Sequence, residues 1–373
     1  MRLGVDAVVD GGVLRPGDVA IADGHITEVD LPPAGSGLIA TRGFVDLQVN
    51  GFAGVDVLAA DEHALRAASV ALAATGVQAW QPTLITSDEA DTVRALRTLA
   101  TVGPEPGGAR ILGVHLEGPF LAPERLGTHP VEHRRDPDRD LLVRLLDAGP
   151  VTYVTLAPEL PGGLDLVDLL VARGIVVSLG HSAADAATAH AGFDRGARTV
   201  THLFNAMTAF APRAPGIVGA ALSRDDVVVQ LIVDGHHLAP ETVRVAFAAA
   251  RERIVLVTDA IAAAGLDDGD YRLGDVEVQV TDGAVRRGDG TLAGSALTMA
   301  DAVRNTISLG VPFLDAVTAA TATPAGLVGH AALAAMWPGA PADLVVLDEA
   351  GTLVRAVHHG ADVTEANTTE ANT

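Results

Sequence analysis

Four side chains that can bind a metal ion or accept a proton each end a short apolar run of the sequence. They are Glu117, His181, His202 and Asp259. The run 111–116 illustrates the pattern, because the carboxylate that ends it precedes a Gly-Pro pair that cannot continue regular structure. In α/β proteins, ligands and metals bind at the carboxyl ends of parallel strands. We therefore expect the four side chains to converge at one end of a parallel sheet.

Hydrolysis by a metal enzyme requires an ion with an open coordination position, a water molecule to activate and a base that takes its proton. Glu117, His181 and His202 offer one carboxylate and two imidazoles, a ligand set that suits Zn²⁺. Asp259 would be the base and later the acid. A single histidine in such a place is more often a hydrogen-bonded core residue than a ligand. Four such strand ends in one chain favour a metal-dependent hydrolase.

The composition excludes several other kinds of chemistry. The chain of 373 residues has no cysteine, and all 25 of its basic residues are arginine. Disulfides, thiolate metal sites, lysine Schiff bases and a carboxylated-lysine metal bridge are therefore excluded. The net charge of −22 argues against a nucleic-acid or anionic-membrane partner, because the field of the protein repels phosphate groups. We interpret the acidity as an aid to solubility or as a sign of a salt-rich cytoplasm.

Hydropathy indicates a protein of the cytoplasm. Apolar residues make up 49% of the chain, which is enough for a large core, and with only 3% aromatic residues that core must consist of alanine, valine and leucine. The chain does not open with the charged and apolar regions of a signal peptide, and no apolar run reaches the ~18 residues of a membrane span.

The central part of the chain must position the four side chains. Apolar runs there alternate with alanine- and leucine-rich segments at helical spacing, such as 62–74 and 184–191. The predicted strands are 44–49, 77–83, 111–116, 151–156, 175–180, 198–202, 227–233 and 254–258. Eight strands joined by helical crossovers predict a (β/α)₈ barrel. A doubly wound open sheet is the alternative, but polar strand ends spread over many strands favour the barrel.

Both ends of the chain have a sequence pattern that is typical of β hairpins and differs from that of the centre. Short apolar stretches alternate with Asp-Gly turns in residues 1–42, and the same pattern returns in 342–347 and 353–357. We predict that segments 1–42 and 335–363 pair into one small β unit beside a barrel of residues 43–334. The polar tail 364–373, Thr-Glu-Ala-Asn-Thr written twice, is expected to be disordered.

One further segment interrupts the pattern after the last predicted barrel strand. Residues 266–294 are rich in glycine and aspartate and contain short strand-like pieces, which predicts a hairpin inserted over the site. Two helices, 297–309 and 313–322, are expected to follow it.

Longer phrases of the sequence resemble one family closely. They are residues 115–120, 155–159, 180–183, 201–207, 234–237, 257–260 and 292–299. In these phrases, and over essentially the whole chain except the tail, the sequence resembles the N-acetylglucosamine-6-phosphate deacetylases of the amidohydrolase superfamily. The resemblance implies a (β/α)₈ TIM barrel with a small β-sandwich formed from both termini, and a homodimer. It implies hydrolysis of the acetamide of N-acetyl-D-glucosamine 6-phosphate to D-glucosamine 6-phosphate and acetate, in amino-sugar catabolism or cell-wall recycling.

The resemblance also assigns roles to individual residues. Glu117, His181 and His202 match the metal ligands of the family, and Asp259 matches its catalytic aspartate. His129 matches a histidine on the acetamide side of the substrate, where it could stabilise the developing oxyanion. The positions that match contacts to the sugar phosphate are Asn205, Ala206, Arg213 and His237, whereas His236 matches a spacer. A structural ion pair is the alternative role for Arg213.

The end of the first barrel strand bears on the number of ions. Many members of the superfamily have His-x-His there and hold two metals, but this chain has Gln48 and Asn50, whose neutral amides are poor ligands for a second transition metal. We interpret both as hydrogen-bonding groups of the barrel mouth. One divalent ion per subunit is therefore expected, with Zn²⁺ preferred and Fe²⁺, Co²⁺ or Mn²⁺ as alternatives.

Three other functions stay open at this point. The first is the same reaction on another substrate, such as N-acetylgalactosamine 6-phosphate or another N-acyl compound. The second is a non-catalytic barrel that has lost its metal, against which the four retained side chains argue. The third is a cell-surface polysaccharide deacetylase, which would need an export signal that the sequence does not show.

Overall fold

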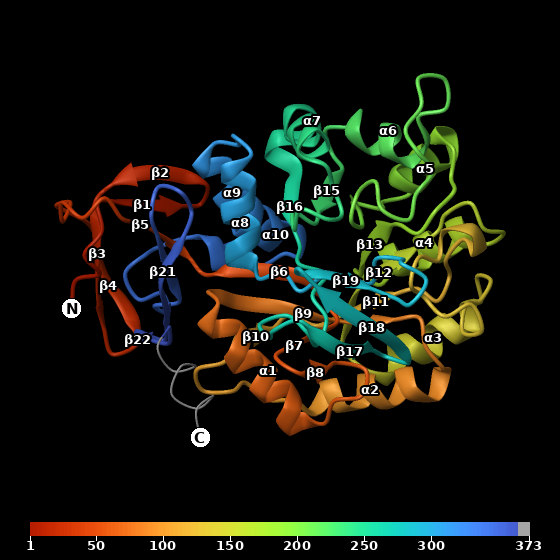
Figure 1. Cartoon of the computed structure of the whole chain (residues 1–373), viewed down its shortest axis with the longest axis horizontal. Helices are drawn as coiled ribbons and strands as arrows, with labels where there is room; N and C mark the ends of the chain where they lie inside the picture. The colour runs from red at the N-terminus through yellow and green to blue at the C-terminus, as the bar shows by residue number, and fades with distance from the viewer. Residues whose placement is uncertain (365–373) are drawn as a thin grey trace.

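A barrel of eight parallel strands forms the centre of the molecule in the computed structural model, which describes residues 1–364. The strands are β6 (Phe44–Val49), β9 (Val77–Ile85), β11 (Val114–Glu117), β12 (Val151–Leu156), β13 (Val176–Leu179), β14 (Thr199–Val200), β15 (Val228–Leu231) and β16 (Ile254–Leu256). Each strand pairs with the next in that order, and a bridge between Val49 and Ala260 joins the first strand to the segment after the last. The predicted (β/α)₈ barrel is therefore confirmed, and the open sheet is wrong (Figure 1).

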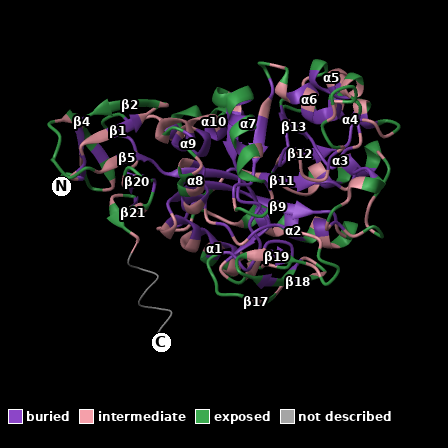
Figure 2. Cartoon of the chain, turned by 45° about the horizontal axis from the view of Figure 1, so that its top comes forward, coloured by how far each residue is buried: buried purple, intermediate pink, exposed green. Residues whose placement is uncertain are grey.

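The barrel strands are short apolar runs because both of their faces are covered. Every residue of β6 and β9 is buried, with side chains pointing alternately into the barrel and towards the helices. Figure 2 shows this buried layer enclosed by a more exposed rim of helices and loops. Strand β14 is shorter than the predicted run 198–202, because the backbone turns at His202, which has a φ of 31°.

Helices follow most barrel strands and cover the outside. They are α1 (Glu62–Ala74), α2 (Glu89–Thr101), α3 (Arg139–Ala148), α4 (Gly163–Ala172), α5 (Ala186–Asp194), α6 (Gly216–Leu222), α7 (Pro240–Ala250), α8 (Met299–Ser308), α9 (Phe313–Ala320) and α10 (Ala322–Leu327). Helix α1 has the predicted bounds, since Asp61 caps its first turn and Leu65, Ala68 and Leu72 form a buried stripe. The predicted helix 313–322 is instead divided into α9 and α10 at Thr321, whose φ of −130° is not helical.

A small β unit from both ends of the chain lies beside the barrel. Its sheet has the order β2 (Val13–Pro16), β1 (Ala7–Asp10), β5 (Ile39–Arg42), β20 (Leu344–Leu347), β21 (Leu353–His358) and β22 (Ala361–Asp362). The hairpin β3 (Asp18–Ala22) and β4 (His25–Leu31) packs with this sheet around a separate apolar core. The two ends meet where β5 pairs antiparallel with β20, as predicted. The boundaries 1–42, 43–334 and 335–363 stay a prediction.

The segment after the last barrel strand covers the barrel mouth. The predicted hairpin in residues 266–294 is a three-stranded sheet of β17 (Gly269–Leu273), β18 (Val276–Thr281) and β19 (Ala284–Arg286). Its apolar face packs on Ile85 at the end of β9 and on Ile261 just after β16. The remaining elements are the short strands β7 (Gly51–Phe52), β8 (Val55–Asp56) and β10 (Arg110–Ile111) and the 3₁₀ helices η1 (Pro123–Arg125), η2 (Arg251–Arg253) and η3 (Ala331–Ala334).

The end of the chain is only partly described. Thr364 is placed against β21, where its hydroxyl accepts the N–H of Ala356 across 2.7 Å. The rest of the tail predicted to be disordered, residues 365–373, lies outside the described residues. Within residues 1–364, no helix combines the length and apolar character that a membrane span needs.

Candidate active site and metal centre

Three of the predicted side chains meet at the carboxyl end of the barrel. Oε1 of Glu117 lies 3.1 Å from Nε2 of His181 and 3.0 Å from Nε2 of His202, and the two imidazole nitrogens are 3.1 Å apart. All three side chains are buried. Burial alone would raise the pKa of Glu117, but the surrounding imidazoles hold that pKa well below its usual range.

The donor atoms of this cluster fit a metal ion. Nδ1 of His181 faces the carbonyl oxygen of Arg125 at 2.8 Å, so Nδ1 carries a proton and Nε2 of the neutral ring presents a lone pair. That lone pair faces a carboxylate oxygen and a second imidazole nitrogen, an arrangement that needs a cation or a proton between the three atoms. Separations of 3.0–3.1 Å suit ligands on a common ion with bonds of about 2.0–2.2 Å.

The backbone around these side chains is strained. His181, His202 and Asp259 have φ values of 47°, 31° and 50°, in the left-handed region that favours glycine. Each such residue costs on the order of 1–2 kcal/mol, and strain of this kind collects at functional sites. The turns after β13, β14 and β16 thus adopt a conformation that lowers stability but directs these side chains towards one another.

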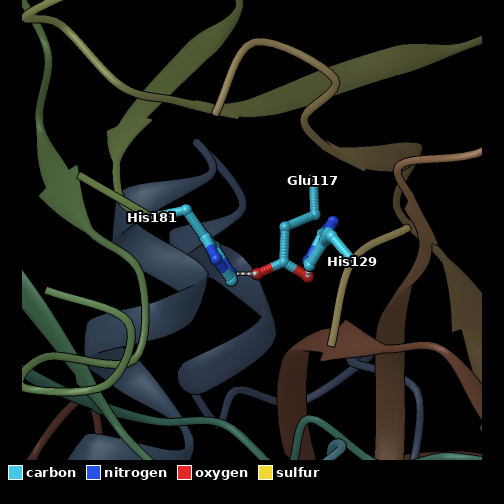
Figure 3. Close-up of side chains that lie close together, drawn as sticks. All are labelled: Glu117, His129 and His181. Carbon is cyan, nitrogen blue, oxygen red and sulfur yellow. Dashed lines mark hydrogen bonds and ion pairs between the residues drawn. The ribbon is translucent and has the colours of Figure 1, made fainter. Parts of the chain in front are cut away.

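A third histidine lies beside the same carboxylate. Figure 3 shows Glu117 between His181 and His129, whose Nε2 is 3.6 Å from Oε2 of Glu117. The group Glu117, His129 and His181 could therefore also hold an ion. However, Nδ1 of His129 accepts the backbone N–H of Thr86 at 3.2 Å, so in the neutral ring Nε2 carries the proton. This tautomer makes His129 a hydrogen-bond donor to the site, whereas Nε2 of His202 lies against the same carboxylate oxygen as Nε2 of His181.

Asp259 completes the predicted set and is held by the two amides of the first strand. Its Oδ1 accepts the Nε2–H of Gln48 at 3.1 Å and the Nδ2–H of Asn50 at 2.7 Å. Gln48 also donates to Oε1 of Glu117 at 3.1 Å. Burial, reinforced by the negative charge of Glu117, raises the pKa of Asp259. Gln48 and Asn50 thus hydrogen-bond the barrel mouth, as we interpreted them, and present amide hydrogens to the carboxylates.

A cavity of about 380 Å³ opens above these residues. Of the predicted substrate contacts, it is lined by His129, Asn205, Ala206 and His237. Nδ1 of His237 pairs with Oδ2 of Asp234 at 2.7 Å, and this contact fixes the orientation of the ring.

The arginine that lines the cavity is not the one that we predicted to bind the phosphate. Arg213 is exposed and is not among the residues that line the cavity, so its role stays a prediction. Arg286, on β19 of the inserted sheet, does line the cavity, although sequence reasoning did not select it. The only signal for it was the expectation that residues 266–294 lie over the site. Nη1 of Arg286 donates to the carbonyl of Gly290 at 2.9 Å.

A second cluster of potential ligands, Asp343, His358 and His359, lies in the small β unit. Oδ1 of Asp343 accepts the backbone N–H of His359 at 2.8 Å and lies 3.1 Å from Nδ1 of His358. Burial works against the charge of Asp343, but the contact with His358 holds its pKa below the usual value. These contacts tie the turn after β21 to the start of β20, which explains the cluster without an ion.

Comparison with known proteins places this site in a family. The sequence matches the amidohydrolase family over residues 39–370, and the chain belongs to that family. The prediction of a metal-dependent hydrolase that acts on amide bonds is confirmed, and the barrel mouth holds a buried group of one carboxylate and neighbouring imidazoles.

Individual relatives resemble the chain over most of its length. The N-acetylgalactosamine-6-phosphate deacetylase of Escherichia coli O157:H7 is 37% identical over 350 residues, which cover 91% of this chain and 93% of the relative. The human N-acetylglucosamine-6-phosphate deacetylase is 41% identical over 332 residues, covering 84% of this chain and 80% of the relative.

Solved structures agree. The N-acetyl-D-glucosamine-6-phosphate deacetylase of Mycobacterium smegmatis superposes with a TM-score of 0.89 at 36% identity, covering 97% of this chain and 100% of that one. The N-acetylglucosamine-6-phosphate deacetylase of Thermotoga maritima superposes with a TM-score of 0.85 at 33% identity, covering 97% and 99%. The resemblance seen in the sequence is thereby confirmed.

Proposed function

We propose that the protein removes the acetyl group of N-acetyl-D-glucosamine 6-phosphate, giving D-glucosamine 6-phosphate and acetate. The observation that carries the proposal is the convergence of Glu117, His181, His202 and Asp259 at the barrel mouth. The relatives named above support the substrate, since those with this activity match most of the chain. We assign the three metal-binding positions to Glu117, His181 and His202, with Zn²⁺ as the preferred ion.

The remaining polar groups divide the proton chemistry between them. When bound, the ion supplies Lewis acidity for the acetamide carbonyl and for the attacking water. Asp259 takes the proton of the water and returns it to the leaving amine. Its Oδ1 accepts hydrogen bonds from Asn50 and Gln48, and Asp259 itself lines the cavity. We assign the proton transfer to Oδ2. The Nε2–H of His129 is placed to donate to the carbonyl oxygen as negative charge develops on it.

The cavity contains groups that suit an anion. Asn205, Ala206 and the Asp234-oriented ring of His237 line it, and Arg286 adds a positive charge from the inserted sheet. A local cation is needed there because the chain carries a net charge of −22, which would otherwise repel a sugar phosphate. Arg213 suits the same group if a second subunit brings it to the cavity, since its planar fork can make two bonds to phosphate.

The proposed assembly is a homodimer. Phe210 is 57% exposed and lies on the same loop as the exposed Arg213. A loop that exposes a large apolar side chain beside a phosphate-binding group fits a contact between two subunits. We further propose that the enzyme works in the cytoplasm, where phosphorylated sugars are retained.

A second substrate is favoured by one specific observation. The relative that acts on N-acetylgalactosamine 6-phosphate covers more of this chain, 91%, than the human relative, 84%. The two sugars differ in the configuration of one ring hydroxyl that is not part of the acetamide, so the catalytic assignments hold for either.

Acetate release measured side by side tests the proposal. The substrates are the 6-phosphates of N-acetylglucosamine and N-acetylgalactosamine and both unphosphorylated sugars, with the metal content of each preparation determined. We expect kcat/KM to be highest for N-acetylglucosamine 6-phosphate. A higher value for the galactosamine compound would favour the second substrate. Metal-loaded protein that releases no acetate from any of the four would refute both.

A further inference from the structure

One carboxylate outside the cavity holds the turn that carries His181. Glu159 follows β12 and reaches across to the turn after β13. Its Oε2 accepts the hydroxyl of Ser182 at 2.7 Å, and its Oε1 accepts the backbone N–H of Ala183 at 2.5 Å. The Ser182 oxygen in turn accepts the N–H of Ala184 at 3.0 Å. Both oxygens of Glu159 are thus occupied by the two residues that directly follow His181.

This contact restrains a backbone that would not hold its shape alone. His181 has a φ of 47°, a conformation that a non-glycine residue keeps only when its surroundings enforce it. Before the strained residue, β13 fixes the chain. After it, Glu159 binds the next two residues, while Ala122 donates its N–H to the carbonyl of His181 at 3.0 Å.

The same turn also supports the other imidazole. The backbone N–H of Ser182 donates to the carbonyl of Ala206 at 3.2 Å, and Ser182 forms a parallel bridge with Met207. Ala206 belongs to the turn after His202 and also has a positive φ, of 51°. A displacement of Ser182 would therefore also displace the turns that carry His181 and His202.

We infer that Glu159 is a positioning residue that sets the separation of the two imidazoles from Glu117 and so the affinity of the centre for its ion. The inference rests on the metal-binding role proposed for Glu117, His181 and His202. Outer groups that orient metal ligands typically change metal affinity by about 10–100-fold when they are removed. A carboxylate is needed because it can accept two donors at once with two separate oxygens.

Zinc affinity, measured without any substrate, tests the inference. Metal-free protein competes with a chromophoric chelator for Zn²⁺, and the rate of Zn²⁺ release to excess chelator is followed in parallel. Glu159→Ala should bind Zn²⁺ about 10–100-fold more weakly and release it faster. Glu159→Gln and Ser182→Ala each remove part of the contact and should show smaller losses in the same direction, which covers the case in which Glu159→Ala does not fold.

Asp185→Ala is the matched control. Asp185 lies three residues after Ser182 and is exposed. It caps α5 by accepting the backbone N–H of Thr188 at 2.8 Å. The control loosens the same segment without touching the Glu159 contact, so its Zn²⁺ affinity should equal that of the unmodified protein. The inference is overturned if folded Glu159 variants bind and release Zn²⁺ like the unmodified protein, or if Asp185→Ala weakens binding equally. Failure of the unmodified protein to bind Zn²⁺ would instead refute the proposed function.

Discussion

Thr86 donates its backbone N–H to Nδ1 of His129 across 3.2 Å, while the Thr86 hydroxyl lies 2.9 Å from the same nitrogen. A backbone N–H can only donate, so Nδ1 must be an acceptor and Nε2 must carry the proton of the neutral ring. Burial, together with the nearby His181, lowers the pKa of His129 to about 4. His129 therefore faces the cavity as a neutral donor throughout the physiological pH range.

The tautomer of His129 predicts which third ligand joins Glu117 and His181 in binding the ion, His202 or His129. His129→Ala should retain the ion and lose about 10²–10³ in kcat, the scale for one donor to a developing oxyanion. His181→Ala is the matched control, because it removes an imidazole on the other side of Glu117 and should lose the ion. Metal content after gel filtration and kcat are measured for both variants. Equal loss of metal would make His129 a ligand.

The side chains at strand ends could be predicted because the local sequence marks them. Glu117 is followed by Gly118 and Pro119, and apolar runs precede His181 and Asp259, so their place in a barrel follows from the strand pattern. Helix α1 was predictable for a similar reason, since a capping aspartate and an apolar stripe lie within one segment.

Features that depend on distant segments were not predictable from residue patterns. His129 lies in a loop, and its contact with Thr86 at the end of β9 exists only in the folded chain; the resemblance alone pointed to it. Arg286 lines the cavity because the inserted sheet packs on Ile85 and Ile261, contacts that span many residues. The left-handed turn at His202 is also set by its surroundings, so the predicted strand 198–202 was too long.

The number of tightly bound ions tests our interpretation of Gln48 and Asn50 as hydrogen-bonding groups and not metal ligands. Gln48 and Asn50 direct amide hydrogens towards Glu117 and Asp259, and so stand as donors where a second ion would need ligands. Elemental analysis after gel filtration should give close to one divalent ion per chain. Two tightly bound ions at full occupancy would contradict this expectation.

Asp259→Asn tests the proton chemistry. The substitution keeps the shape of the side chain and a contact with Asn50, but it removes the group that accepts a proton. We expect kcat to fall by about 10²–10⁴, as for a positioned general base, while metal content changes little. Steady-state kinetics and metal analysis on the same preparation check both points. A fully active variant, or one without metal, would show that the assigned role is wrong.

We expect Asp46 to make the free energy of unfolding depend on pH. It is buried at the end of the network below the site, where its carboxylate accepts the hydroxyl of Thr258 at 2.6 Å, and burial raises its pKa to about 7. Between about pH 4 and 7, the folded protein therefore keeps a proton that the unfolded chain has lost. The free energy of unfolding should fall as pH rises through this window, by up to about 4 kcal/mol from this group.

Asp46→Asn cannot ionise and should lose this dependence. Urea unfolding of the metal-free protein at pH 5 and pH 8 measures the effect for both forms. The free energy of unfolding of the variant, minus that of the unmodified protein, should be larger at pH 8 than at pH 5. A difference between the two forms that is the same at both pH values would mean that Asp46 does not titrate in this range.

Selectivity for the phosphorylated sugar tests the role of Arg286, which lines the cavity. Removing Arg286 should lower kcat/KM for the phosphorylated sugar and leave the slow reaction of the unphosphorylated sugar unchanged, because binding energy from a remote group positions the reacting one. Arg287→Ala is the matched control, since Arg287 is the next residue and lies 3.8 Å from Asp289. An equal fractional loss on both sugars would assign Arg286 a structural role.

Arg213→Ala should show the same selectivity, with a loss of about 2–4 kcal/mol in transition-state stabilisation for the phosphorylated sugar. Arg213 is exposed and is not among the residues that line its own cavity, so the proposed contact requires a second subunit. Mixed dimers of Arg213→Ala and Asp259→Asn chains test this directly. In such a dimer, the Arg213→Ala chain keeps its base and receives Arg213 from the other chain, so one site of the pair should regain activity on the phosphorylated sugar. If mixing restores nothing while dimers exchange subunits, Arg213 does not act across the interface, and the phosphate is left to Arg286 and His237.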